Sequence, residues 1–264
     1  MTLFCEQQPS SNRIPPLPSG ADRSEVSISG EQNIESAAKF WGHLGLRFSG
    51  QAKSKWYPIS SEVADRVRQN VKRSQNVSEW IVVETMNNHT LAFRPMQVHR
   101  IWLLDDTCAA PEGDFDREAP WHDWEGLPPE MYLAMAEWAD RAYGNCSEKG
   151  DPISAFSRAT YKTAVSVIKQ AGLADRPEDV RAALRHTTVH FTNGSTTQYE
   201  VNREDLLELV ELDAQPDIQL VEISACDRDF ESFYPTSALT MIDIPTIELN
   251  AVRLEMWGSD YLSE

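Results

Sequence analysis

The stretch HTTVHFTNGSTTQYEVNREDLLELV, residues 186–210, contains two short alternating runs on either side of Asn193-Gly194, followed by leucines at helical spacing. An Asn-Gly pair between two alternating runs is the strongest short-range signal for a β-hairpin. Asn202 is a good N-cap for the helix that the leucine spacing indicates. The stretch therefore predicts a strand, a tight turn, a second strand and a helix.

A second stretch of the chain repeats this order of features. HLGLRFSGQAKSKWYPISSEVADRV, residues 43–67, again contains two strand-like runs, a glycine turn and a helical run after Ser60. Further shared positions follow in both stretches. The matches are Phe48 with Phe191, Tyr57 with Tyr199, Ile59 with Val201, Val83-Glu84 with Val221-Glu222, and Phe93-x-Pro95 with Phe233-x-Pro235. We therefore predict that one unit occurs twice, in a first segment (residues 43–106) and a second segment (residues 186–245).

The two segments differ strongly in charge. Residues 43–106 contain nine Lys/Arg and six Asp/Glu, a net charge of +3, whereas residues 186–264 contain three Lys/Arg and sixteen Asp/Glu, a net charge of −13. The whole chain carries −17, so its surface as a whole is unsuited to nonspecific contact with nucleic acid, which requires Lys and Arg. We expect the two segments to share a scaffold and to differ in what they bind.

Each segment is predicted to contain five short strands and one helix. The last part, Phe-x-Pro followed by an apolar closing strand, resembles the Sm-like and SH3-like small barrels. The resemblance implies a small barrel or a strongly bent sheet. It carries no RNA-contact residues onto this chain, because the helix follows the first hairpin and an Sm pattern would place it at the amino end. The predicted fold class is α+β, with two related β-rich repeats joined by a helical connector.

Composition along the chain predicts four regions. Residues 1–32 form a Pro- and Ser-rich tail, in which a polyproline docking segment is an alternative to a plain linker. Residues 33–107 form the first β-rich repeat with a leading helix, since Ile34, Ala37, Ala38 and Trp41 have helical spacing. Residues 108–185 form an acidic aromatic loop and a connector with helices starting at Pro128-Pro129, Asp151-Pro152 and near Pro177. Residues 186–264 form the second, acidic repeat.

Neither composition nor motifs indicate an enzyme, a metal or a cofactor. The chain has no GxSxG, no phosphate-binding glycine loop and no HExxH. Its four cysteines are scattered without regular spacing, so neither a zinc site nor a disulfide framework is indicated. His186 and His190 are four residues apart, but we interpret them as a solvated sheet face, and residues 114–125 break the calcium-loop pattern at Ala119 and Pro120. No apolar run is long enough for a membrane span, and the start lacks a signal peptide, so we expect a cytosolic protein.

Two aromatic residues stand in the acidic loop. Trp121 and Trp124 lie three residues apart among carboxylates, in APWHDWEGLPPE (residues 119–130). Large aromatic side chains in a polar loop either pack on their own domain or anchor a partner. We keep both alternatives, and we take Trp121 and Trp124 as candidate partner-binding residues.

The first segment also contains a candidate nucleic-acid surface. Basic and aromatic residues alternate there, which is typical of platforms for single-stranded nucleic acid. The candidate residues are Arg47, Lys53, Lys55, Trp56, Arg68 and Lys72. A solvated helix, or a dock for the acidic second segment, would have the same composition.

The leading functional hypothesis is a non-enzymatic adaptor or regulator. We expect its acidic second segment to bind a basic protein surface, and a nucleic-acid mimic is the extreme form of this hypothesis. The candidate carboxylates are Glu204, Asp205, Glu208, Glu211, Asp227 and Asp229. The alternative is an RNA- or DNA-binding protein that uses the basic first segment. Complementary segments also permit head-to-tail oligomers, so an oligomer is a further prediction.

Overall fold

The computed structural model describes most of the chain after residue 39. The described ranges are 40–73, 79–106, 124, 126–144, 156–201, 203–215, 218–224 and 231–257. By its internal contacts the chain divides into Met1–Ala37 and Ala38–Glu264, and every element below belongs to the latter. The fold is α+β, as predicted. Within the described ranges, no helix is long and apolar enough to cross a membrane.

The first segment contains five strands and one helix in the predicted order. Ser60 begins the helix, because its Oγ accepts a hydrogen bond from the Val63 N–H at 3.3 Å. Gly45 leaves room for the Trp56 ring, which would meet a Cβ at 2.8 Å. The elements are β1 (Phe40–Phe48), β2 (Lys55–Ser60), α1 (Ser61–Arg73), β3 (Ile81–Glu84), β4 (His89–Phe93), the 3-10 turn η1 (Pro95–Gln97) and β5 (Val98–Asp105).

The second segment has the same order of elements, followed by one helix more. Its hairpin turns at Gly194, whose φ of 84° is the left-handed conformation that glycine adopts without strain. The elements are β6 (Thr187–Phe191), β7 (Thr196–Tyr199), α5 (Arg203–Val210), η3 (Leu212–Ala214), β8 (Leu220–Ser224), β9 (Glu231–Pro235), η4 (Thr236–Ala238), β10 (Leu239–Pro245) and α6 (Thr246–Trp257). No sequence pattern predicted α6.

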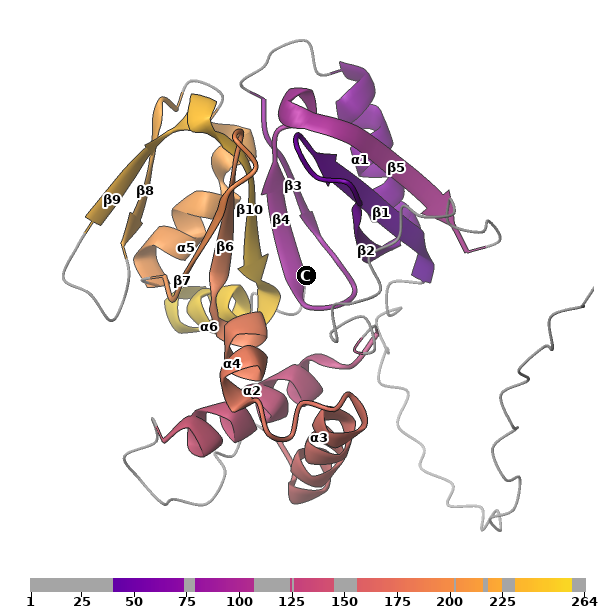
Figure 1. Ribbon diagram of the computed structural model, residues 1–264, viewed down its shortest axis with the longest axis vertical. Helices are drawn as coiled ribbons and strands as arrows, with labels where there is room; N and C mark the ends of the chain where they lie inside the picture. Colours follow the sequence, from indigo (N-terminus) through magenta and orange to yellow (C-terminus); the bar gives the residue numbers. More distant parts are fainter. Residues whose placement is uncertain are drawn as a thin grey trace, which may run out of the picture. The chain divides into compact units, whose positions relative to one another are not determined.

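Three helices stand between the segments in the described part of the connector. They are α2 (Pro129–Tyr143), α3 (Arg158–Gln170) and α4 (Pro177–Arg185). Their alanine-rich faces pack together around Met135, Ile168 and Leu184, and Ile247 of α6 joins this apolar cluster. Figure 1 shows the three helices below the sheets, with α4 leading directly into β6. The connector therefore has a core of its own and is anchored to the second segment.

The strands form three antiparallel sheets, and one sheet belongs to both segments. The first has the order β2-β1-β5, the second β3-β4-β10-β6-β7, and the third β8-β9. β10 of the second segment thus pairs with β4 of the first, with Ile242 opposite Ala92. Figure 1 shows β4 and β10 side by side at the centre of this sheet. No closed barrel forms from the described strands, so the bent-sheet alternative describes each segment better than the small barrel.

Strand pairing shows which positions of the two segments correspond. Each first strand has a bulge where it meets the last strand, with Phe48 opposite Val98 and Phe191 opposite Leu239. The 3-10 turns before β5 and β10 therefore place Phe93 in correspondence with Tyr234, one residue away from the predicted match to Phe233. Burial agrees, because Phe93 and Tyr234 each pack against the core of their own segment. The predicted Phe-x-Pro alignment is therefore off by one residue.

In the same register Ile81 corresponds to Val221, because Ile81 pairs with Phe93 and Val221 with Tyr234. Trp80 thus corresponds to Leu220, and the predicted match of Val83 with Val221 is off by two residues.

The apolar cores of the two segments exchange side chains. Met241 of β10 lies in the core of the first segment. Trp80 and Ala92 of the first segment lie in the core of the second, with Leu206, Ile242 and Leu249. Asn88, in the β3–β4 turn, also caps α6, since its Oδ1 accepts a hydrogen bond from the Ile247 N–H at 2.9 Å. The two segments are therefore packed against each other as one body and are not separate domains joined by a linker.

Two local predictions about helices are wrong. Trp41, Gly42 and Gly45 lie in strand β1, where Trp41 was expected to end a helix; the preceding residues lie outside the described ranges. The second connector helix begins at Arg158 rather than at Asp151-Pro152, because Ser157 is its N-cap and accepts a hydrogen bond from the Thr160 N–H at 3.1 Å. Asp151-Pro152 lies outside the described residues.

Candidate functional site

Trp124 packs inside the protein. Only 1% of its surface is exposed, and its carbonyl oxygen accepts a hydrogen bond from the Tyr132 hydroxyl. It belongs to the core of the connector helices with Met131 and Leu184. The self-packing alternative therefore describes Trp124, and it is not available to anchor a partner. Trp121 lies outside the described residues, as does the rest of the calcium-like loop.

The basic candidates of the first segment do not form one surface. Trp56 is 2% exposed and packs in the sheet, so its face is not available for stacking on a base. Lys55 points inward, with its amino group 3.4 Å from Nε2 of His190. Arg47 donates a hydrogen bond to the Gln51 carbonyl at 3.2 Å.

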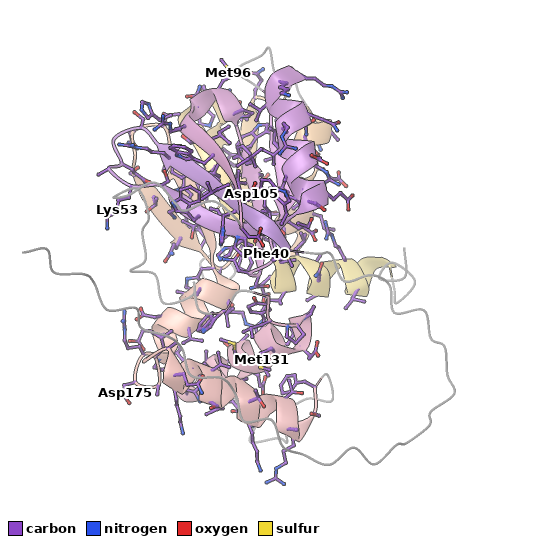
Figure 2. All side chains as sticks on the ribbon, turned by 90° about the vertical axis from the view of Figure 1, so that its right-hand side faces the viewer. Phe40, Lys53, Met96, Asp105, Met131 and Asp175 are labelled. Carbon is purple, nitrogen blue, oxygen red and sulfur yellow. The ribbon has the colours of Figure 1, made fainter. Side chains whose placement is uncertain are left out.

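The other basic candidates lie further apart. Arg68 of α1 forms an ion pair with Asp65, and Lys72 is exposed near the end of the same helix. Figure 2 shows Lys53 on the opposite side of the first segment from α1. The composition of a nucleic-acid platform is present, but its members are not brought together.

Few of the acidic candidates are described. Glu208 and Glu211 are exposed, on and just after α5. Asp205 is used locally, because its carboxylate accepts a hydrogen bond from the Ser224 N–H at 2.6 Å and so ties α5 to β8. The side chain of Glu204 and residues 227 and 229 lie outside the described part. Within the described residues, Glu208 and Glu211 are thus the acidic candidates with exposed side chains.

The sheet β8–β9 exposes the largest apolar side chains of the second segment. Leu220 is 53% exposed and Phe233 is 54% exposed, on neighbouring strands. Their counterparts in the first segment are Trp80, 5% exposed, and Ala92, which is fully buried against β10 and α5. β8 and β9 pair only with each other among the described strands. Within the described residues, this face of β8–β9 is thus left open, whereas the corresponding face of the first segment is covered.

A buried polar cluster lies where β2, β4, β6 and β10 meet. The Asp243 carboxylate of β10 accepts a hydrogen bond from the Tyr57 hydroxyl at 3.1 Å and pairs with Nδ1 of His89 at 2.7 Å. His190 stacks on Phe48 with ring centroids 5.1 Å apart, and its Nδ1 has no partner within the described part of the protein. His190 is 2% exposed, so its interpretation as part of a solvated sheet face is wrong. These residues come from both segments and fix how the strands meet.

Burial and charge shift the pKa values in this cluster. Burial raises the pKa of Asp243, but the positive charges of His89 and Lys55 outweigh it and hold the pKa below its ordinary value. Burial, and then the charge of Lys55, lower the pKa of His190 to about 3. Burial, and then the charge of Asp243, raise the pKa of Tyr57 well above its ordinary value. Near neutral pH the cluster therefore contains a carboxylate, a neutral His190 and a protonated tyrosine.

A cavity of about 240 Å³ opens beside the cluster. Its lining residues include Lys55, His89, His186, Thr188, Gln198 and Asp243. The Asp243–His89 pair could exchange a proton with a small polar molecule in this space. Two pairs of lining side chains already bond to each other, however: His89 with Asp243, and Gln198 with Thr188. Within the described ranges, no three His, Cys, Asp or Glu residues are placed to hold a metal ion. The strongest role that the contacts support is joining the two segments.

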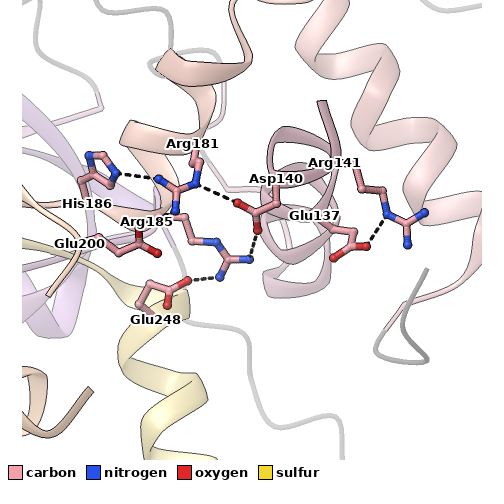
Figure 3. Close-up of polar contacts among 8 residues, drawn as sticks. All are labelled: Glu137, Asp140, Arg141, Arg181, Arg185, His186, Glu200 and Glu248. Atoms are coloured by element: carbon pink, nitrogen blue, oxygen red, sulfur yellow. Dashed lines mark hydrogen bonds and ion pairs between the residues drawn. The ribbon is translucent and has the colours of Figure 1, made fainter. Parts of the chain in front are cut away.

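Ion pairs join the connector helices to the second segment, as Figure 3 shows. Asp140 of α2 accepts from Arg181 at 3.1 Å and from Arg185 at 2.8 Å, both on α4. Arg185 also pairs with Glu248 of α6, and Arg181 with Glu200 after β7. Burial lowers the pKa of Arg185, but the two carboxylates outweigh it and raise the pKa above its ordinary value. Glu200, one of the carboxylates that give residues 186–264 their negative charge, is thus engaged within the protein.

Sequence reasoning missed the open β8–β9 face and the polar cluster. The signal for the open face was the presence of two large apolar residues, Leu220 and Phe233, at positions whose counterparts in the first segment are covered. The cluster had no local signal, because Asp243 and His89 are distant in sequence and meet only through pairing of β10 with β4. The chain matches no family model, and comparisons with curated proteins and with solved structures find no significant similarity.

Proposed function

We propose that the protein is a non-enzymatic adaptor or regulator and that its second segment binds a basic surface of a partner protein. The observation that carries the proposal is the open face of β8–β9, defined by Leu220 and Phe233, each more than half exposed. Large apolar side chains that stay exposed on adjacent strands indicate a protein interaction site. Aromatic side chains such as Phe233 are also typical anchors of protein interfaces.

The edge of the sheet supports the same proposal. β9 pairs with β8 on one side only within the described strands, so its other side offers backbone N–H and C=O groups to an added strand. Residues 186–264 carry a net charge of −13, which would attract a basic partner during encounter. The partner class is therefore a protein with an extended, basic and partly apolar segment.

The narrower hypotheses have less support. A nucleic-acid mimic needs regularly spaced free carboxylates, and Asp205 is bound to the Ser224 N–H. Direct nucleic-acid binding by the first segment loses Trp56 and Lys55 to the interior. We therefore propose neither of them. A cytosolic location is part of the proposal and rests on the sequence alone.

The test uses the purified full chain as bait on a resin. Partner capture is compared for the unchanged chain, the double variant Leu220→Ser/Phe233→Ser, and the control Tyr143→Ser, whose side chain is equally exposed at 54% but lies on α2. We expect the unchanged chain and the control to capture the same protein, and the double variant to lose it. Capture should also weaken when the salt concentration rises from about 50 to about 500 mM. Capture that is equal for all three chains, or no capture of any protein, a second copy of this chain included, would contradict the proposal.

A further inference from the structure

We propose that the partner of the β8–β9 face is a second molecule of the same chain, whose β5 adds to β9 and joins the molecules head to tail. This inference rests on the proposed function and names its partner. The chain itself contains the template for the contact. β10 is the last strand of the second segment and pairs antiparallel with β4, the fourth strand of the first, with Ile242 opposite Ala92 and Met241 opposite Phe93.

Among the described strands, the two that correspond to β10 and β4 each have a partner on one side only. β5 corresponds to β10 and β9 to β4, since each precedes or follows the equivalent 3-10 turn. Within the described sheets, β5 pairs only with β1 and β9 only with β8. Figure 1 shows β5 and β9 on opposite sides of the shared sheet, so they do not meet within one molecule. A second molecule can satisfy both edges with the pairing that the chain already uses internally.

The pattern of burial indicates the same partner. Trp80 and Ala92 close the apolar core of the second segment in the internal contact. Leu220 and Phe233 correspond to them, and in the proposed contact they would close the core of the first segment of the next molecule. On that side Ile101 of β5 would face Phe233, as Ile242 faces Ala92. Ile101 is partly exposed and packs at the border of its core.

The helices follow the same rule. In the internal contact η3, which follows α5, touches β3. Counted from the start of each helix, the last residues of α1 correspond to η3. Val71 lies among them and is 36% exposed. In the proposed contact Val71 would approach β8 of the next molecule. An exposed apolar residue thus lies on each of the two surfaces that the template brings together.

Charge complements the apolar contacts. The end of α1 carries Lys72 and Arg73, both exposed, and the exposed His99 and Arg100 follow Val98 at the start of β5. These groups would approach the second segment of the next molecule, which belongs to residues 186–264 with their net charge of −13. We therefore expect the contact to weaken as salt rises.

Two differences between the two contacts limit the strength of the second. Arg100 takes the place of Met241, which in the internal contact lies in the core of the first segment. Internally, the Arg94 N–H donates to the Thr240 carbonyl at 3.0 Å, at the end of the paired strands. Pro235 corresponds to Arg94 and has no N–H. The contact between molecules therefore lacks one hydrogen bond of the template, and proline at an edge strand is typical of limited pairing. We expect reversible association that depends on concentration, and the head-to-tail geometry permits rings or open chains.

The first test measures the mass of the purified chain by sedimentation velocity over about a hundredfold range of concentration. We expect the average mass to rise with concentration and to fall at high salt. Leu220→Ser/Phe233→Ser should weaken the association by about tenfold or more, and Tyr143→Ser should leave it unchanged. A monomer at every concentration overturns the inference. Association that the double variant does not weaken also overturns it, because another surface would then be responsible.

The second test fixes the register. In a chain whose four native cysteines are changed to serine, Phe233→Cys and Ile101→Cys are made as separate proteins and mixed under mild oxidation. Directly opposed residues of paired strands lie within disulfide range, so the mixture should give the cross-linked pair. Phe233→Cys mixed with Lys53→Cys is the control and should stay uncross-linked. Equal cross-linking in both mixtures overturns the register.

The two proposals can fail separately. If the chain stays monomeric but captures a different protein through Leu220 and Phe233, the head-to-tail inference is wrong and the proposed function stands. If the chain neither associates nor captures a partner through these residues, both are wrong.

Discussion

Ala92 and Phe233 occupy corresponding positions in their segments, but Ala92 is completely buried whereas Phe233 is 54% exposed. The difference arises because β10 covers β4, and no described strand covers β9 on the same side. The smaller side chain lies where the space is filled, and the larger one where it is open. This relationship is the basis of the account that β8–β9 is a binding face.

Replacing Trp80 and Leu220, which also correspond, should have opposite consequences for the single molecule. Trp80→Ala removes a side chain from the core of the second segment, so we expect a loss of about 3–5 kcal/mol of unfolding free energy. Leu220→Ala should change it by less than about 0.5 kcal/mol in dilute solution. Urea denaturation of both variants measures this contrast. A large loss for Leu220→Ala would mean that its side chain is part of the fold.

Protonation of His190 should make the protein less stable in mild acid. Its folded pKa is about 3, below the ordinary value of 6.5, so the unfolded chain takes up a proton first as the pH falls. The unfolding free energy should therefore fall between pH 6.5 and about 3, by up to about 1.4 kcal/mol per pH unit. His190→Phe should flatten this part of the urea midpoint profile, and His99→Ala, at an exposed position, should not. Equal slopes for all three proteins would contradict the assignment.

Asp243 should affect the unfolding free energy in a lower pH range than His190. Its folded pKa lies below the ordinary value of 3.8, so its contribution is complete above that value and is lost as the pH falls through the folded pKa. Asp243→Asn leaves Tyr57 and His89 without the carboxylate, and we expect a loss of about 3 kcal/mol at neutral pH. The difference between variant and unchanged chain should shrink below about pH 4. A difference that is constant from pH 7 to about pH 3 would show that charge is not its cause.

The ion pairs around Arg185 should hold the connector helices to the second segment. Arg185→Met leaves Asp140 and Glu248, both less than one-fifth exposed, without this partner, and we expect a loss of about 2–3 kcal/mol. Arg141→Met removes an ion pair within α2 and should cost less than about 1 kcal/mol. Amide hydrogen exchange in α2 and α4 measures both effects. Faster exchange in these helices for Arg141→Met than for Arg185→Met would contradict the ranking.

Elements with local signals could be predicted from the sequence. Asn193-Gly194 gives the turn between β6 and β7, and Pro177 gives the start of α4, because turn and cap preferences depend on neighbouring residues. Helix α6 had no such signal, since Asn88 caps it from the other segment. The same order of strands in the two segments is a structural fact, and their origin by duplication stays a hypothesis.

The candidate site depended on pairing between distant strands, which sequence patterns do not contain. The Phe-x-Pro match placed Phe233 in correspondence with Phe93, a core position, and so concealed that Phe233 points away from the core of its own segment. Charge counts showed that the second segment is rich in acidic residues. They did not indicate that Asp205 and Glu200 are bound within the protein, because both partners are set by tertiary contacts.

The cysteine experiment at Phe233 and Ile101 tests the central claim most directly, because it requires both the binding face and its partner strand. We predict that Phe233→Cys and Ile101→Cys form a disulfide-linked pair when mixed, and that the pair is lost when Leu220→Ser is added to the first protein or when salt is raised. No cross-link at concentrations where the chain associates would contradict the claim that β5 of one molecule pairs with β9 of the next.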